Sequence, residues 1–282
     1  MKIIDTYSLA LTSYGDSGFS FERWKKYIDS ALPGLFPVLA EDVKSVLRTG
    51  EFSEEDYLAA LNMAGQNRDR LEAAHDSFAR VTNGLDGIIT ERFGKSPDAD
   101  VIFYLGLCNG AGWATEYRGK TAILLGMEKI AELNWCGVGD MYGLICHELG
   151  HVYQKQYGIL KRSFDKGEDS LLWQLFTEGV AMCFEQTAAG DPEFYHQDKN
   201  GWKEWCDGHF EQIKSDFASN LKTMTPADQR YFGDWVSYNG RGDVGYYLGC
   251  RFVRYILSDY DFDEIIGFDI DRVKELFERF LR

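Results

Sequence analysis

The stretch "GLICHELGHVYQKQYG", residues Gly143 to Gly158, carries two of the chain's five histidines, four residues apart. On an α-helix, residues i and i+4 lie one above the other on the same face, so His147 and His151 can point at one ion. Glu148 borders the same patch and can reach a metal-bound water without being a ligand. A helix that presents two imidazoles and a carboxylate is what zinc hydrolysis chemistry requires. The stretch therefore predicts a metal site on a helix that ends near Gly158.

A catalytic zinc takes three protein ligands and keeps its fourth position for water, so a third ligand is needed. Glu178, in "LLWQLFTEGVAM", is the best candidate because it lies in an apolar helical stripe. A carboxylate there is costly unless a positive group meets it. Gly179 beside it would also allow a second helix to approach closely. Four residues in more polar windows stay as rivals for the third ligand: His196, His209, Asp165 and Glu185.

The organisation of the chain favours an α+β protein that is mostly helical. Residues 21–95 read as successive amphipathic helices, and the chain reads as helical again from Ser170 onward. Between them, 101–108 and 121–127 are short apolar runs typical of strands, and the glycine-rich stretch 109–120 can hold an edge strand or a hairpin. We therefore expect an N-terminal helical region (1–97), an α/β lobe with the motif helix (98–160) and a helical lobe with the third ligand (161–282), which together form one catalytic unit.

Composition narrows the class of partner and the compartment. The 282-residue chain is 45% apolar, which is enough for a real core, and its net charge is -15. Nucleic-acid partners need basic patches, so this charge argues against them. No apolar run is long enough to cross a membrane, and the first residues lack the pattern of a signal peptide. The six cysteines, none of them in a C-x-x-C pair, are read as free thiols. We expect a cytoplasmic protein.

The motif "HELGH" followed by "FTEGVA" resembles the gluzincin metallopeptidases, in which H-E-x-x-H is completed by a glutamate from a later helix. The nearest likeness is to uncharacterised bacterial proteins predicted to be zinc-dependent proteases, which carry a "GYYLG"-like segment downstream, as this chain does at Gly245 to Gly249. The resemblance covers about residues 100–260.

This resemblance implies a zincin-like fold, with a cleft between the α/β lobe and the helical lobe. It also implies one Zn2+ per chain, bound by His147, His151 and Glu178, with Glu148 as general base and acid. The implied substrate is a peptide or protein that lies extended along an edge strand. We expect this strand between Cys108 and Met127, with pairing around residues 110–114.

Three further residues have open roles. A tetrahedral oxyanion needs a donor besides the metal. Tyr246 is favoured because it aligns with the small and apolar stripe that includes Gly249. Tyr247 is the alternative, and otherwise both are packing aromatics. Gluzincin aminopeptidases carry G-x-M-E-N, whose glutamate captures a free amine. This chain has "LGMEK" instead, so Glu128 is an amine anchor or, with more weight, an ordinary acid at a helix start.

Three hypotheses about function follow from these patterns. The first is peptide-bond hydrolysis by a zinc metallopeptidase of gluzincin type. The second is a catalytically silent module of zincin fold that binds a peptide or protein. The third is a zinc hydrolase that acts on a non-peptide amide. An intact Glu148 favours an enzyme, because a module that only binds has no need of a general base.

Overall fold

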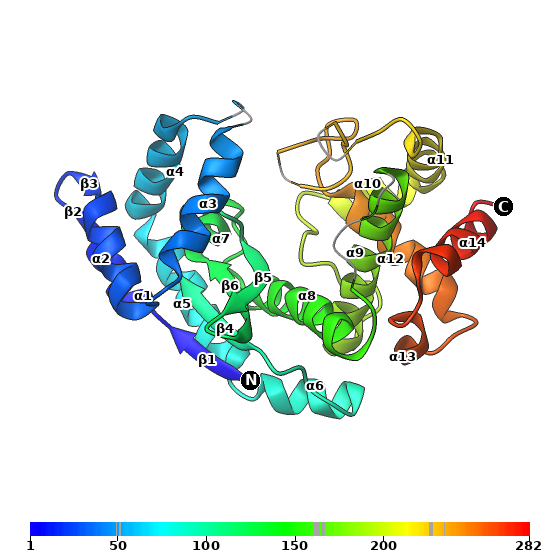
Figure 1. The fold of residues 1–282 in the computed structure, drawn as a ribbon, viewed down its shortest axis with the longest axis horizontal. Helices are drawn as coiled ribbons and strands as arrows, with labels where there is room; N and C mark the ends of the chain where they lie inside the picture. The colour runs from blue at the N-terminus through cyan, green and yellow to red at the C-terminus, as the bar shows by residue number, and fades with distance from the viewer. Residues whose placement is uncertain (49, 51, 161–163, 165–166, 226–227, 234) are drawn as a thin grey trace. The chain divides into compact units, whose positions relative to one another are not determined.

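The computed structural model describes all of the chain except residues 49, 51, 161–163, 165–166, 226–227 and 234 (Figure 1). The protein is mostly helical with a small sheet, which is compatible with the predicted α+β class. It divides into two compact units, Met1–Glu148 and Leu149–Arg282. The boundary falls inside helix α8 (Val138–Tyr157), which therefore contributes to both units. The three regions expected from the sequence stay a prediction.

The first unit contains a four-stranded sheet in the order β1-β4-β6-β5. Its strands are β1 (Lys2–Asp5), β4 (Asp100–Tyr104), β5 (Gly112–Tyr117) and β6 (Lys120–Gly126). The strands β1, β4 and β6 are parallel, whereas β5 pairs antiparallel with β6 and forms an edge. The glycine-rich stretch therefore does hold an edge strand. A two-stranded hairpin, β2 (Tyr14–Gly15) with β3 (Gly18–Phe19), lies apart from this sheet.

Two details of the sheet differ from the prediction. The sequence does not predict strand β1, which forms by pairing in parallel with β4. Strand β4 ends at Tyr104, so the second half of the apolar run 101–108 is a loop. This loop leaves the sheet because its backbone N–H groups bond to side chains instead of to a neighbouring strand.

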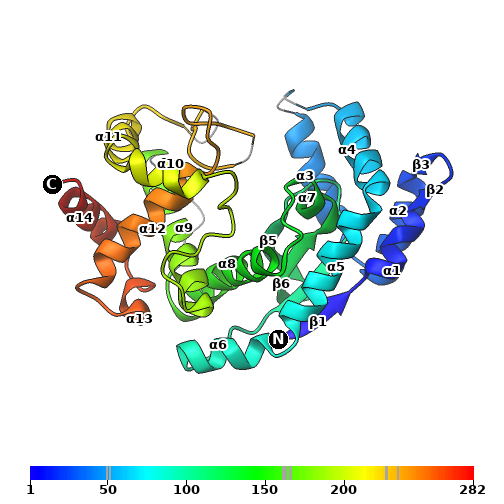
Figure 2. The ribbon, with the colours of Figure 1, turned by 180° about the vertical axis from the view of Figure 1, so that it is seen from behind.

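The first unit has helices before and after most of its sheet, and those within residues 21–95 form where the amphipathic pattern predicts them. Their bounds are α1 (Tyr7–Ala10), α2 (Phe21–Ala31), α3 (Phe36–Leu47), α4 (Glu54–Gln66), α5 (Arg68–Thr82), α6 (Leu85–Phe93) and, after the sheet, α7 (Met127–Glu132), with a 3-10 turn at Leu11–Ser13. Ser53 caps α4 in a reciprocal capping box with Asp56. Helix α5 packs on the sheet (Figure 2). Its Phe78 stacks on Phe103 of β4, with ring centroids 4.9 Å apart.

The described part of the second unit is built on helices, as the sequence from Ser170 onward predicts. They are α9 (Gly167–Ala189), α10 (Trp202–Gly208), α11 (Phe210–Asn220), α12 (Val244–Leu257), α13 (Phe262–Ile265) and α14 (Ile270–Phe280). Helices α9 and α12 pack closely against each other, and both are apolar over most of their length. Across the described ranges, no helix is both long and apolar enough to span a membrane. All six cysteines are free thiols.

Candidate metal centre

Helix α8 carries the motif as the periodicity predicts. Ile145, Leu149 and Val152 are buried and fix one face of the helix in the core. His147 is also buried, with 4% of its surface exposed. The helix ends at Tyr157, directly before Gly158, which is the predicted stop.

Glycines set how closely α9 approaches its neighbours. A Cβ on Gly150 of α8 would lie 2.9 Å from the Cα of Ala181 on α9, so only a glycine allows the two helices to pack this closely. On α9, a Cβ on Gly179 would lie 2.2 Å from the carbonyl oxygen of Gly249 on α12. The close approach of a second helix at Gly179 is therefore confirmed. Each of these glycines is next in the chain to a proposed ligand, Gly150 to His151 and Gly179 to Glu178.

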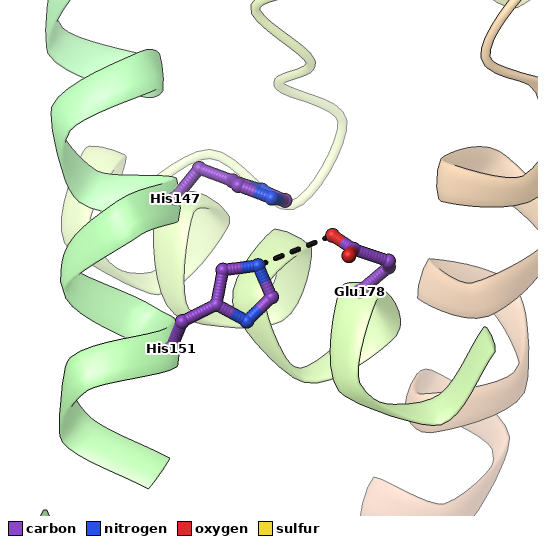
Figure 3. Close-up of side chains that lie close together, drawn as sticks. All are labelled: His147, His151 and Glu178. Carbon is purple, nitrogen blue, oxygen red and sulfur yellow. Dashed lines mark hydrogen bonds and ion pairs between the residues drawn. The ribbon is translucent and has the colours of Figure 1, made fainter. Parts of the chain in front are cut away.

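The three predicted ligands come together on α8 and α9 (Figure 3). One donor atom from each of His147, His151 and Glu178 lies within 4.8 Å of the other two. The Nε2 atom of His151 is 3.2 Å from Oε2 of Glu178. Ligand atoms on a tetrahedral zinc are about 3.3 Å apart, given zinc–ligand bonds near 2.0 Å. The spacing of His151 and Glu178 therefore fits a tetrahedral zinc, and the donors of the three residues together could hold a metal ion.

Glu148 lies beside the edge strand. It is buried, with 8% of its surface exposed, and faces Gly112 at the start of β5. A Cβ on Gly112 would lie 3.0 Å from Cγ and 3.1 Å from Oε1 of Glu148, and 2.9 Å from Leu144. The backbone of the edge strand therefore passes against the carboxylate that the sequence assigns as general base. The sequence predicts a strand here, but it does not predict the contact with Glu148. The only sequence feature that could have indicated this contact is the glycine at the start of the strand.

The rivals for the third ligand are engaged elsewhere or are not described. The Nδ1 atom of His196 lies 2.8 Å from Oε2 of Glu185, in a pair that is almost fully buried. The ring of His209 stacks on Trp205 with centroids 4.2 Å apart. Asp165 lies outside the described residues. Within the described part of the chain, only Glu178 joins the two motif histidines in a group of possible ligands.

The two tyrosines of α12 have different surroundings. Tyr247 is fully buried, and its hydroxyl donates to Oδ1 of Asp207 at 2.6 Å, while burial raises its pKa. Tyr246 is half-buried and packs edge-on against Phe232, one helical turn before Gly249. The hydroxyl of Tyr247 is thus bonded to Asp207, and Tyr246 stays the predicted oxyanion donor.

Glu128 is neither exposed at a helix start nor open to a ligand. It does lie in the first turn of α7, but only 2% of its surface is exposed. Its two carboxylate oxygens accept hydrogen bonds from the backbone N–H groups of Gly106 and Cys108, at 2.9 Å and 3.0 Å. Desolvation by burial raises its pKa to about 7. Because both oxygens are already engaged, the amine-anchor interpretation is not supported.

No family model, no curated protein and no solved structure matches this chain. The likeness to gluzincins therefore stays an expectation from its motifs, and arguments about function rest on the geometry of the site.

Proposed function

We propose that the protein is a zinc-dependent peptidase in which Glu148 acts as general base. The observation that carries this proposal is the group of His147, His151 and Glu178, whose donor atoms lie within 4.8 Å of one another. Structural zinc sites are closed by four protein ligands, whereas catalytic sites use three and keep one position for water. Among the residues that the structure describes, this group has three members. Its donor set therefore favours a catalytic site.

The residues around the group suit amide hydrolysis. When bound, zinc would polarise the scissile carbonyl and lower the pKa of a bound water. Glu148 follows His147 on the same helix, so its carboxylate can take the proton from that water and return it to the leaving amine. The outer edge of strand β5 can pair with an extended peptide, and Gly112 at its start lies against Glu148. Tyr246 is the proposed donor to the oxyanion, and the cleft around the site stays a prediction.

The test combines metal analysis with a peptide-library digest of the purified chain. We expect about one zinc per chain, lost when His147, His151 or Glu178 is replaced by alanine. Glu148→Gln keeps size and removes the base, so it should retain zinc while losing about a hundred- to ten-thousand-fold in rate. The matched control is Glu132→Gln, an exposed acid on α7, which should change neither zinc content nor rate.

The outcomes separate the three hypotheses. A Glu148→Gln variant as active as the wild-type protein would refute the mechanism. Full zinc occupancy without cleavage of any peptide would favour a silent binding module, and cleavage of simple amides but not of peptides would favour a non-peptide hydrolase. Zinc that survives the loss of Glu178 would remove this residue from the ligand set.

A further inference from the structure

The loop that leads into the edge strand is held by an unusual set of bonds. This β4–β5 loop comprises residues 105–111. Four successive residues of the loop donate their backbone N–H groups to side-chain oxygens. These donors are Leu105, Gly106, Leu107 and Cys108. A loop whose N–H groups bonded to water would need none of these side chains. The bonds therefore fix the path of the backbone just before β5.

Glu128 makes two of these four bonds. Its Oε2 accepts from Gly106 and its Oε1 from Cys108, so one carboxylate spans both residues. Gly126, two residues before Glu128, holds the other end of the loop, because its N–H donates to the carbonyl oxygen of Ala111 at 3.0 Å. The short segment from the end of β6 into α7 thus holds the loop at both ends.

The N-terminal helices hold the same loop from the other direction. The hydroxyl of Tyr27, on α2, accepts the N–H of Leu105 at 3.2 Å. Asn109 accepts the N–H of Leu107 and donates to Oδ2 of Asp42, on α3, at 2.6 Å. The helices that the family resemblance does not cover are therefore tied to the loop that precedes Gly112.

We propose that Glu128 is a positioning residue for the substrate: it fixes the β4–β5 loop and thereby holds β5 in place beside Glu148. The inference rests on the proposed function for the role of β5 as the substrate strand. It does not require Glu128 to touch substrate or metal. A peptide paired with the strand makes the same backbone bonds before and during the reaction, so loosening the strand weakens binding and leaves the chemical step unchanged.

The test is Glu128→Gln, studied at a pH of about 8. The amide can accept only one of the two backbone N–H groups. We expect hydrogen–deuterium exchange of residues 105–117 to accelerate. For a peptide selected from the library, we expect KM to rise about tenfold, as for a lost hydrogen bond to a charged group, with kcat and zinc content unchanged. Glu132→Gln, on the same short helix, should leave exchange, KM and kcat as they are in the wild-type protein.

Several results would overturn the inference. Unchanged exchange would show that Glu128 does not hold the loop, and faster exchange with unchanged KM would show that the loop does not position substrate. A parallel loss of kcat, zinc and thermal stability would indicate a general structural role. If Glu128→Gln does not fold, Asn109→Ala removes the acceptor for Leu107 and the link to α3, and it should raise KM in the same way. If the wild-type protein cleaves no peptide, the proposed function fails, whereas the exchange measurement still decides whether Glu128 holds the strand.

Discussion

A single methyl group at Gly112 tests whether the edge strand and Glu148 depend on each other. In Gly112→Ala, the new Cβ would lie 2.9 Å from Leu144 Cδ1, 3.0 Å from Glu148 Cγ and 3.1 Å from Glu148 Oε1. These distances are shorter than ordinary contacts, which begin at 3.4 Å. Either β5 moves away by several tenths of an ångström, or the Glu148 side chain changes its rotamer.

The two costs differ in kind. Overpacking a well-filled site costs about 1–3 kcal/mol of stability. Displacing a catalytic group by about 1 Å can cost roughly a hundredfold in rate. We therefore expect the variant to keep its zinc, to unfold at a somewhat lower urea concentration and to lose ~10- to 100-fold in kcat/KM for a library-selected peptide.

The matched control is Gly139→Ala in the first turn of α8, where a Cβ meets no atom within 4 Å. This variant should gain about 0.5–1 kcal/mol, because alanine is the better helix former, and its activity should not change. The reasoning is refuted if Gly112→Ala, with full zinc, cleaves peptide as fast as Gly139→Ala does. Equilibrium urea unfolding, zinc analysis and initial rates supply the three measurements.

Three further predictions concern stability. Gly179→Ala should destabilise the protein by about 3 kcal/mol or more in urea unfolding and should weaken zinc binding, because its Cβ would lie 2.2 Å from the carbonyl oxygen of Gly249; unchanged unfolding would contradict the close approach of α9 and α12. Tyr153→Phe should cost about 1–2 kcal/mol, because its hydroxyl donates to Asp263 Oδ1 at 3.0 Å, and a double variant with Asp263→Asn should show that the two effects are not additive. Burial raises the pKa of Glu128 from 4.5 to about 7, so between these pH values the folded state binds more protons than the unfolded state and stability falls as pH rises. Glu128→Gln lacks this titration, so its unfolding free energy minus that of the wild-type protein should increase by up to about 3 kcal/mol as the pH rises through this window. A difference that does not change with pH would contradict the raised pKa.

The sequence predicted the parts of the site that depend on local periodicity. Helix α8 and its two histidines follow from a spacing of four residues, and Glu178 follows from a carboxylate inside an apolar helical stripe. The edge strand follows from the glycine-rich stretch before β6. In each of these cases, residues close together in the chain carry the signal.

The features that the sequence did not predict depend on residues far apart in the chain. Glu128 reads as a helix-start acid in any local window, and only its bonds to Gly106, 22 residues earlier, reveal its role. Strand β1 becomes recognisable only when Ile3 pairs with Val101 of β4. His196 and Glu185 likewise meet only because the chain reverses its direction after α9. The sequence does not predict this reversal, so both residues remain possible metal ligands in the sequence analysis.

Glycines at close contacts connect the metal group to the rest of the fold, and they give a reason to favour an enzyme over a binding module. Gly150 and Gly179 let α9 approach its neighbours and so set the place of Glu178, which any protein that holds a metal with this group would need. Gly112 is different, because it serves Glu148, which is not in the group of possible ligands. A general base must lie within reach of the bond that is cleaved, whereas a module that only binds makes no such demand on the position of Glu148. The contact of Gly112 with Glu148 therefore supports the proposal that β5 presents an extended peptide to a general base.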